Sequence, residues 1–536
     1  MQKNADFIFE NASVFTANPS QPFAEAVAIT GNRISFVGGN AGAHAYKRNE
    51  TRIIDMGGNT LMPGFIDSHY HMMYGALNMD GMQLEAADSF EELSRIVHTY
   101  AAEHPDIPWL AGTGLRYNLG PNNTALTRQH LDSLVADRPI YINSFDGHTS
   151  WANTIALKMA GIFHGGKTAP NSENVLDEHG ESTGELREPV AYKPVSDLVP
   201  KPDEARKRSL LRQALYRTAS LGITSVHNMD GNAEQAARYA AFEDLGELTC
   251  RIYLPYSVTP ETSIEALERE ATEMLNSYSR DVLRTGSVKF FIDGVIEGFT
   301  GLLVDPYTDD HTTCGAANYD LEQFNHLVAK ADHLKMQIFT HAVGDMGVRK
   351  VLDAYQYAQS QNGKRDARHR VEHIELIHPE DLLRFEQLGV LASMQPLHAP
   401  MRVEEGDIWV QRVGAQRWPL SFAWQTLREA GATLVFGSDW PVVTQNPFQG
   451  ISNATTRDPW VEGMPHQKQS LFDTLIAYTR GAAYAEFQEH QKGQIRENYL
   501  ADLVALPKNI FKMELVDIGS LTPALTMVNG RVVYEA

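Results

Sequence analysis

Two histidines one residue apart, His69 and His71, close the segment PGFIDSHYH at the end of a short apolar stretch. Side chains alternate between the two faces of an extended chain, so both imidazoles point the same way, as two ligands of one metal ion must. Histidines at this spacing also occur by chance on protein surfaces. The pair therefore indicates a metal site only if further ligands follow along the chain.

Further residues of ligand type stand at or near the ends of other apolar segments. They are Lys289 in SVKFFIDG, His341 in QIFTHAVGD, His373 in HRVEHIEL and Asp439 in LVFGSDWP. Imidazole nitrogens and carboxylate oxygens bind divalent metals such as zinc. The alternative interpretation is that these are polar residues that happen to end apolar strands. Their regular recurrence favours one shared metal site.

The apolar segments that carry these residues alternate with helical stretches. The candidate strands are residues 61–68, 223–228, 251–256, 287–293, 337–341, 370–374, 391–395 and 433–438. This rhythm predicts an α/β fold, a TIM-like (β/α)8 barrel over residues 61–485, whose site lies at the carboxyl ends of the strands. Residues 75–200 break the rhythm and contain two strand-like pieces of their own. We interpret them as an insertion after the first barrel strand, because counting those pieces would give ten strands.

Both ends of the chain show short alternating segments separated by glycine-containing turns, such as Asn529-Gly530. This pattern is typical of small antiparallel sheets. Since isolated hairpins are rarely stable, residues 1–60 and 486–536 are predicted to form one small β-sandwich domain.

The composition excludes several functional classes. A net charge of −21 argues against nucleic acid or an anionic membrane surface as the main partner. The cysteines, Cys250 and Cys314, provide no disulfide framework. No signal peptide or membrane span is visible in the sequence. We therefore expect a cytoplasmic protein that acts on a small-molecule substrate. Whether it forms a homo-oligomer stays open.

Several motifs of the chain resemble those of a known family. PGFIDSHYH, SVKFFIDG, FTHAVGD, RHRVEHIEL, SMQP, FGSDWPV and the tail LADLVAL…VNGRVVY are similar to motifs of the metal-dependent amidohydrolase superfamily. Within it they resemble the branch of YtcJ-like proteins and N-substituted formamide deformylases. The resemblance implies two adjacent divalent ions, usually Zn²⁺. His69, His71 and Asp439 would hold one ion, His341 and His373 the other, and a carboxylated Lys289 would bridge them.

These ligand types predict a mechanism. A metal acidifies a bound water, so that hydroxide is available at neutral pH to attack a substrate carbonyl. Asp439 is placed to accept the proton of that water and to pass it to the leaving amine. The predicted reaction is hydrolysis of an amide-type C–N bond. Alternatively, Lys289 is an ion-pair partner of Asp293. The site would then hold one divalent metal ion, zinc or another.

Five further residues are candidates for substrate binding. They are His148, His227, Glu297, Gln395 and Trp440. Each has a structural alternative: a turn or packing role for His148, a hydrogen bond to a pocket residue for His227, solvent exposure for Glu297, a backbone contact for Gln395 and core packing for Trp440. Glu297 stands where relatives often have small residues, and a carboxylate there could select a cationic or amine-bearing substrate.

Two other functions compete with amide hydrolysis. A deaminase or cyclic amidase acting on a heterocycle would use a similar site, but it would release ammonia or a ring-opened acid. The third hypothesis is a non-catalytic metal-binding regulator, although a complete ligand set and the acidic charge balance argue against it.

Overall fold

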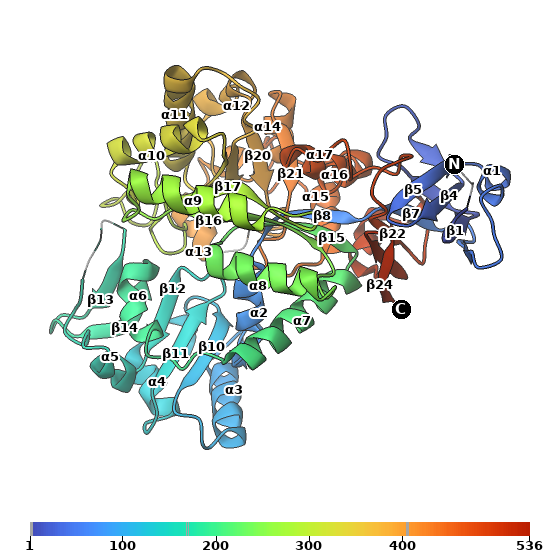
Figure 1. The fold of residues 1–536 in the computed structure, drawn as a ribbon. Helices are drawn as coiled ribbons and strands as arrows, with labels where there is room; N and C mark the ends of the chain where they lie inside the picture. The colour runs from blue at the N-terminus through green and yellow to red at the C-terminus, as the bar shows by residue number, and fades with distance from the viewer. Residues whose placement is uncertain (1–3, 168, 170, 404–406) are drawn as a thin grey trace.

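A parallel barrel forms the centre of the molecule in this computed structural model, which describes residues 4–167, 169, 171–403 and 407–536 (Figure 1). Eight parallel strands follow one another around it in chain order. They are β8 (Phe65–Tyr70), β15 (Ile223–Asn228), β16 (Arg251–Ser257), β17 (Leu283–Phe291), β18 (Gln337–Ala342), β19 (Arg370–His373), β20 (Leu391–Met394) and β21 (Thr433–Phe436). The predicted barrel fold is confirmed.

The barrel closes between its first and last strands at the level of the candidate ligands. The backbone N–H of Asp439 donates to the carbonyl of His69 at 2.7 Å, and that of His71 donates to the carbonyl of Trp440 at 3.0 Å. These two bonds tie the end of β8 to the residues that follow β21. Closure therefore fixes His69, His71 and Asp439 relative to one another.

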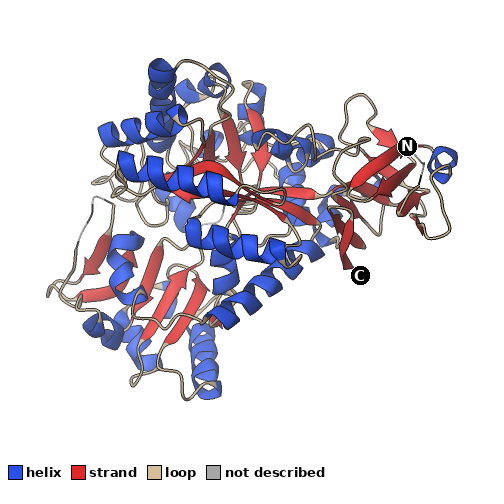
Figure 2. Cartoon of the chain, viewed as in Figure 1, coloured by secondary structure: helices blue, strands red, loops and turns tan. Residues whose placement is uncertain are grey.

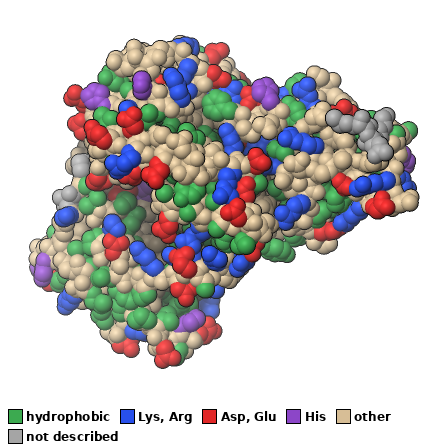
Figure 3. All heavy atoms as spheres, viewed as in Figure 1, with side chains coloured by type: hydrophobic (Ala, Val, Ile, Leu, Met, Phe, Trp, Pro, Cys, Tyr) green, Lys and Arg blue, Asp and Glu red, His purple; other side chains and the backbone are tan. Residues whose placement is uncertain are grey.

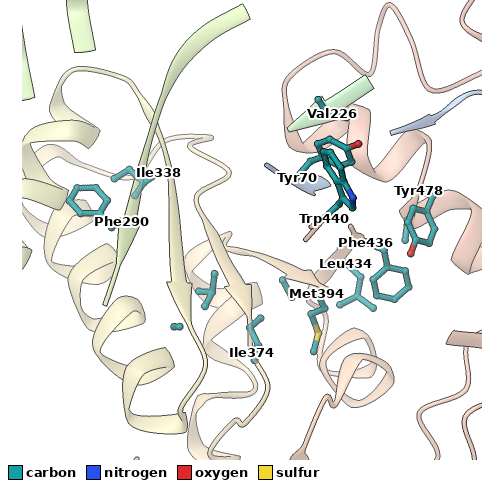
Figure 4. Packing of buried hydrophobic residues seen from close by; sticks show 14 of the residues in the cluster. Tyr70, Val226, Phe290, Ile338, Ile374, Met394, Leu434, Phe436, Trp440 and Tyr478 are labelled. Carbon is teal, nitrogen blue, oxygen red and sulfur yellow. The ribbon is translucent and has the colours of Figure 1, made fainter. Parts of the chain in front are cut away.

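Helices cover the outside of the barrel. They include α2 (Met72–Asn78), α7 (Glu204–Ser220), α8 (Ala233–Asp244), α9 (Ile264–Tyr278), α10 (Leu321–His333), α11 (Asp345–Asn362), α12 (Arg384–Leu388), α13 (Ile408–Val413), α14 (Trp424–Glu429), α15 (Pro447–Thr456), α16 (Leu471–Ala477) and α17 (Arg480–Ala485). Asp203, Asn232, Ser263 and Asp320 cap the first turns of α7 to α10 with side-chain oxygens. The largest hydrophobic core lies between these helices and the strands, and Figure 4 shows part of it.

The first predicted strand, residues 61–68, is wrong as a single element. Its first half is β7 (Thr60–Pro63), which belongs to another sheet, and the barrel strand β8 starts at Phe65. Gly64 separates them, and a Cβ there would lie 2.1 Å from the Thr224 methyl group, so only glycine fits. One continuous apolar run thus serves two sheets, which hydrophobic periodicity alone does not reveal.

Strands from both ends of the chain share one sheet beside the barrel, where both termini lie in Figure 1. The six-stranded sheet has the order β24-β23-β22-β7-β2-β3, and a four-stranded sheet has the order β5-β4-β1-β6. Their bounds are β1 (Phe7–Glu10), β2 (Ser13–Phe15), β3 (Phe23–Ala24), β4 (Ala26–Thr30), β5 (Arg33–Gly38), β6 (Arg52–Asp55), β22 (Leu503–Ala505), β23 (Leu525–Val528) and β24 (Arg531–Glu535), with helix α1 (Asn40–His44) after β5. Phe9, Val27, Leu503 and Met527 share one buried cluster between the sheets. The predicted domain boundaries stay a prediction.

The segment predicted as an insertion folds around its own six-stranded sheet, which Figure 2 shows apart from the barrel strands. The strands are β9 (Met82–Gln83), β10 (Leu110–Leu115), β11 (Ile140–Ser144), β12 (Thr149–Ala152), β13 (Glu173–Leu176) and β14 (Ser182–Arg187). Helices α3 (Phe90–Glu103), α4 (Arg128–Leu134), α5 (Thr154–Met159) and α6 (Glu188–Ser196) accompany them. The chain enters this sheet after β8 and returns to the barrel at β15, so the barrel order is undisturbed.

A buried ion pair joins the barrel to the terminal sheets, and breaking it should destabilise the protein. Arg251, at the start of β16, donates from Nε to Asp502 at 2.6 Å, with side chains only 6% and 4% exposed. Asp502→Ala would leave a buried guanidinium unpaired, which costs about 3–5 kcal/mol. We expect a lower thermal unfolding midpoint than for Asp244→Ala, which breaks the exposed Arg280–Asp244 pair and should cost about 0–1 kcal/mol. Equal midpoints for the two variants would contradict this role.

No helix within the described residues is long and apolar enough to cross a membrane. On the face shown in Figure 3, acidic and basic side chains are interspersed and form no single basic stripe.

Candidate metal centre

His69, His71 and Asp439 meet at the carboxyl-terminal end of the barrel. Asp439 Oδ1 lies 3.3 Å from His69 Nε2 and 3.1 Å from His71 Nε2. The three ligand atoms all lie within 4.8 Å of one another. Asp439 adopts a φ of 63°, which is uncommon for a residue with a side chain and is held by the backbone bonds that close the barrel.

Each of these histidines is oriented by a second carboxylate. His69 Nδ1 donates to Glu372 Oε2 at 2.7 Å, and His71 Nδ1 donates to Asp230 Oδ1 at 2.7 Å. With Nδ1 bonded to a carboxylate, each ring directs Nε2 toward Asp439. This is the arrangement in which proteins prepare histidines for metal binding.

His341 and His373 form a second group beside the first. Their ring centroids are 4.4 Å apart, and the His373 ring lies 4.6 Å from that of His69. His341 Nε2 donates to the carbonyl of Gly294 at 2.9 Å, which leaves Nδ1 as its acceptor. His373 Nδ1 donates to Gln395 Oε1 at 2.9 Å, which leaves Nε2. Each of the two imidazoles thus keeps one nitrogen without a hydrogen.

Lys289 is fully buried on β17, and burial lowers its pKa to about 8. Its Nζ has no hydrogen-bond partner among the described residues. The alternative pairing with Asp293 is not found, since Asp293 accepts the backbone N–H groups of Leu302, Val343 and Gly344. An amine whose charge is disfavoured by burial is suited to a neutral or carboxylated form.

The residues present fit a divalent metal. His69 Nε2, Asp439 Oδ1 and Lys289 Nζ are buried without a hydrogen-bond partner in the part of the chain that the structure describes. Although burial opposes a positive charge, Asp230 and Asp439 raise the pKa of His71 to about 9. The same two carboxylates would favour a metal cation. The imidazole and carboxylate donors are ligands that zinc accepts.

The ligand groups lie at the base of a cavity of about 1050 Å³. Its walls include Tyr74, Phe145, Tyr192, Phe291, Tyr319 and Trp409. It also receives carboxylates from Asp146, Glu188, Glu261, Glu297, Glu375 and Asp407, against Arg116 as the one lysine or arginine among its described lining residues. The cavity is therefore aromatic and acidic.

The inserted sheet supplies one wall of the cavity and brings His148 to it. His148 Nδ1 lies 3.0 Å from Glu188 Oε2, and its ring centroid is 5.4 Å from that of His341. Although burial opposes a positive charge, Glu188 raises the pKa of His148 to about 9. Glu297 also lines the cavity. Burial, Glu375 and Asp146 raise its pKa well above the ordinary value.

Three residues predicted to contact substrate are not among the described residues that line the cavity. Gln395 instead holds the His373 ring. Trp440 packs in the core against Tyr70, at 5.1 Å between ring centroids, as Figure 4 shows. His227 is fully buried deeper in the barrel, where Arg370 donates to its Nδ1 at 2.8 Å and Glu486 lies 3.2 Å from its Nε2.

Sequence reasoning missed three residues at the site. They are Asp230, Glu372 and Glu188. Glu372 immediately precedes His373, and Asp230 follows β15 by two residues. Both therefore lie in or next to predicted barrel strands. Glu188 gives no such signal, because its position depends on how the insertion packs.

Comparisons with known proteins identify the family of the chain. Residues 52–534 match the amidohydrolase family. The chain is 29% identical to the putative amidohydrolase YtcJ of Bacillus subtilis (strain 168), with 91% of this chain and 92% of the relative covered. It is 24% identical to the N-substituted formamide deformylase of Arthrobacter pascens, with 100% and 99% covered.

A solved structure shows the same architecture. The uncharacterized metal-dependent hydrolase from Pyrococcus furiosus superposes with a TM-score of 0.72 at 25% identity, covering 95% of this chain and 99% of that one. The predicted enzyme class, a hydrolase acting on carbon–nitrogen bonds, is confirmed by these matches. The chain belongs to the amidohydrolase family.

Proposed function

We propose that this protein hydrolyses the C–N bond of an N-substituted formamide or amide and releases an amine. The observation that carries the proposal is the convergence of His69, His71, His341, His373 and Asp439 at the base of one aromatic cavity. The similarity to a formamide deformylase over the whole chain supports the substrate class. The protein is proposed to work in the cytoplasm on a small molecule, as its composition predicts.

Two divalent ions, with zinc the first candidate, would be held by these residues. His69, His71 and Asp439 form one ligand group, and His341 and His373 contribute to the other. Lys289, carboxylated on its amine, would add an anionic ligand between them. Bound there, divalent ions supply an acidified water and polarise the substrate carbonyl.

Asp439 is proposed to move the proton in this reaction. Despite its burial, His69 holds the pKa of the Asp439 carboxyl well below its ordinary value, so the carboxylate is ionised and able to accept a proton. Asp439 lies between the ligand histidines and the cavity, so the same carboxylate can return that proton to the departing amine.

The cavity walls are proposed to select the substituent on the substrate nitrogen. Aromatic side chains such as Phe145, Tyr192 and Trp409 would pack on an apolar group. Burial, followed by the charges of Glu375 and Asp146, raises the pKa of Glu297 well above its ordinary value. A cationic group on the substrate would favour the ionised form of this carboxyl, so amine-bearing substrates belong among the candidates.

Product analysis over a chemical panel tests this function. Metal-loaded protein is incubated with N-substituted formamides, longer N-acyl amines and cyclic ureas, some carrying a second amino group. We expect an amine and a carboxylate, formate in the first case, in equal amounts. Release of ammonia would instead favour a deaminase, and a ring-opened acid would favour a cyclic amidase. No product from any member would argue for a non-catalytic role.

A further inference from the structure

His398 follows β20, the seventh barrel strand, and lies against the metal centre without an assigned role. Its side chain is 10% exposed and lines the cavity. Its ring is nearly parallel to that of His373, with centroids 5.8 Å apart and 12° between the planes. It therefore packs against one of the ligand histidines.

The free nitrogen of His398 is aimed at Asp439. Nε2 lies 3.6 Å from Asp439 Oδ2 and has no hydrogen-bond partner among the described residues. This separation is too long for a hydrogen bond between the two groups. Two ligands of one tetrahedral zinc, each about 2.1 Å from it, stand about 3.4 Å apart. The distance thus matches a pair of ligands better than a hydrogen bond.

The other nitrogen of His398 faces a carboxylate, as do the corresponding nitrogens of His69 and His71. Glu375 Oε1 lies 3.7 Å from His398 Nδ1, and Trp409 Nε1 donates to Glu375 Oε2 at 2.6 Å. Glu372 and Asp230 occupy the same side of His69 and His71. A carboxylate behind the ring is the usual support of a metal-ligating histidine. The Glu375 contact, at 3.7 Å, is longer than the 2.7 Å hydrogen bonds of His69 and His71, so Glu375 faces the ring without bonding to it.

Asp439 presents its two oxygens to two different groups. Oδ1 faces His69 and His71, whereas Oδ2 lies 3.6 Å from His398 Nε2. The nitrogen of His373 that lies 3.9 Å from Oδ2 is Nδ1, which also contacts Gln395, so binding a metal through Nδ1 would replace that hydrogen bond. One nitrogen from each of His373 and His398 and one oxygen of Asp439 all lie within 4.8 Å of one another. We propose that His398 is a further metal ligand, at a position that it shares with His373 and Asp439. This inference rests on the metal centre proposed above.

Zinc binding by His398→Ala tests the inference. Wild type, His398→Ala and His398→Asn are equilibrated at a series of buffered free Zn²⁺ concentrations, and bound zinc per chain is measured by elemental analysis. We expect both variants to bind at least one zinc more than about 100-fold more weakly than wild type. This exceeds the about 10–100-fold loss that removal of a supporting group causes.

Two comparison variants separate a ligand from a supporting residue. Glu375→Gln keeps the His398 ring but removes the carboxylate behind it, so its loss of zinc affinity should be smaller than that of His398→Ala. His466→Ala, at an exposed position, should bind zinc like wild type. Circular dichroism of the metal-free proteins, measured in parallel, shows whether each variant is folded, and His398→Asn stands in if His398→Ala is not.

The outcomes distinguish this inference from the function on which it rests. If wild type binds zinc and the folded His398 variants bind it equally well, or lose no more affinity than Glu375→Gln, His398 is not a ligand. If wild type binds neither zinc nor another divalent ion, the metal centre itself is overturned.

Discussion

Asp439→Asn should reduce kcat/KM for amide hydrolysis by about 1000-fold or more, because the proton acceptor and an anionic ligand are lost together. The substitution keeps the shape of the side chain, and its backbone would still bond to His69 at the barrel closure. Folding should therefore be retained. Amine release under initial-rate conditions, on protein with its metal content measured, gives the result.

The matched control is Asp137→Asn, which makes the same chemical change at a side chain that is 84% exposed. Its kcat/KM should equal that of wild type. If Asp439→Asn retained more than about a tenth of the wild-type kcat/KM, neither a proton-transfer role nor a ligand role for Asp439 could stand.

Lys289→Met should remove at least one bound metal ion per chain and reduce kcat/KM by about 100-fold or more, the scale of loss when ligand support is removed. Methionine keeps much of the buried alkyl chain and places no charge in the barrel, so the core should tolerate it. Elemental analysis and amine release are measured on the same samples. Intact-mass or ¹³C spectra of wild type supplied with ¹³C-bicarbonate should show a carbamate on Lys289.

The structural alternative for Lys289 predicts a different outcome. A lysine with only a packing role would leave metal content and kcat/KM unchanged in Lys289→Met and would show no carbamate. Lys350→Met, on the outside of α11, provides the control, and its metal content should match wild type.

The barrel and the positions of the candidate ligands were predictable because parallel strands bring their carboxyl ends to one edge. Apolar strands with a polar residue at the end are visible in the sequence, and His341 and His373 could be assigned to adjacent strands without coordinates. The strand count depends on assigning residues 75–200 to an insertion after β8, because only then does Lys289 fall on the fourth strand.

Depth within the barrel could not be predicted in the same way. His227 also lies near the end of an apolar strand, yet it is fully buried with Arg370 and Glu486 and does not reach the cavity. Trp440 follows a ligand directly but turns into the core against Tyr70. Glu188 and His398 reach the site from the insertion and from a loop, whose paths depend on tertiary packing and carry no periodic signal.

Bound metal and amine release, measured on the same protein, show whether the reaction depends on the metal centre. The chain is stripped with a chelator, shown to be folded, and reloaded with increasing Zn²⁺ in the presence of an N-substituted formamide from the panel that wild type hydrolyses. We predict that amine release falls to background without metal and rises in proportion to occupancy of the His69–His71–Asp439 group. Metal-free protein that releases amine as fast as the reloaded protein would contradict the account.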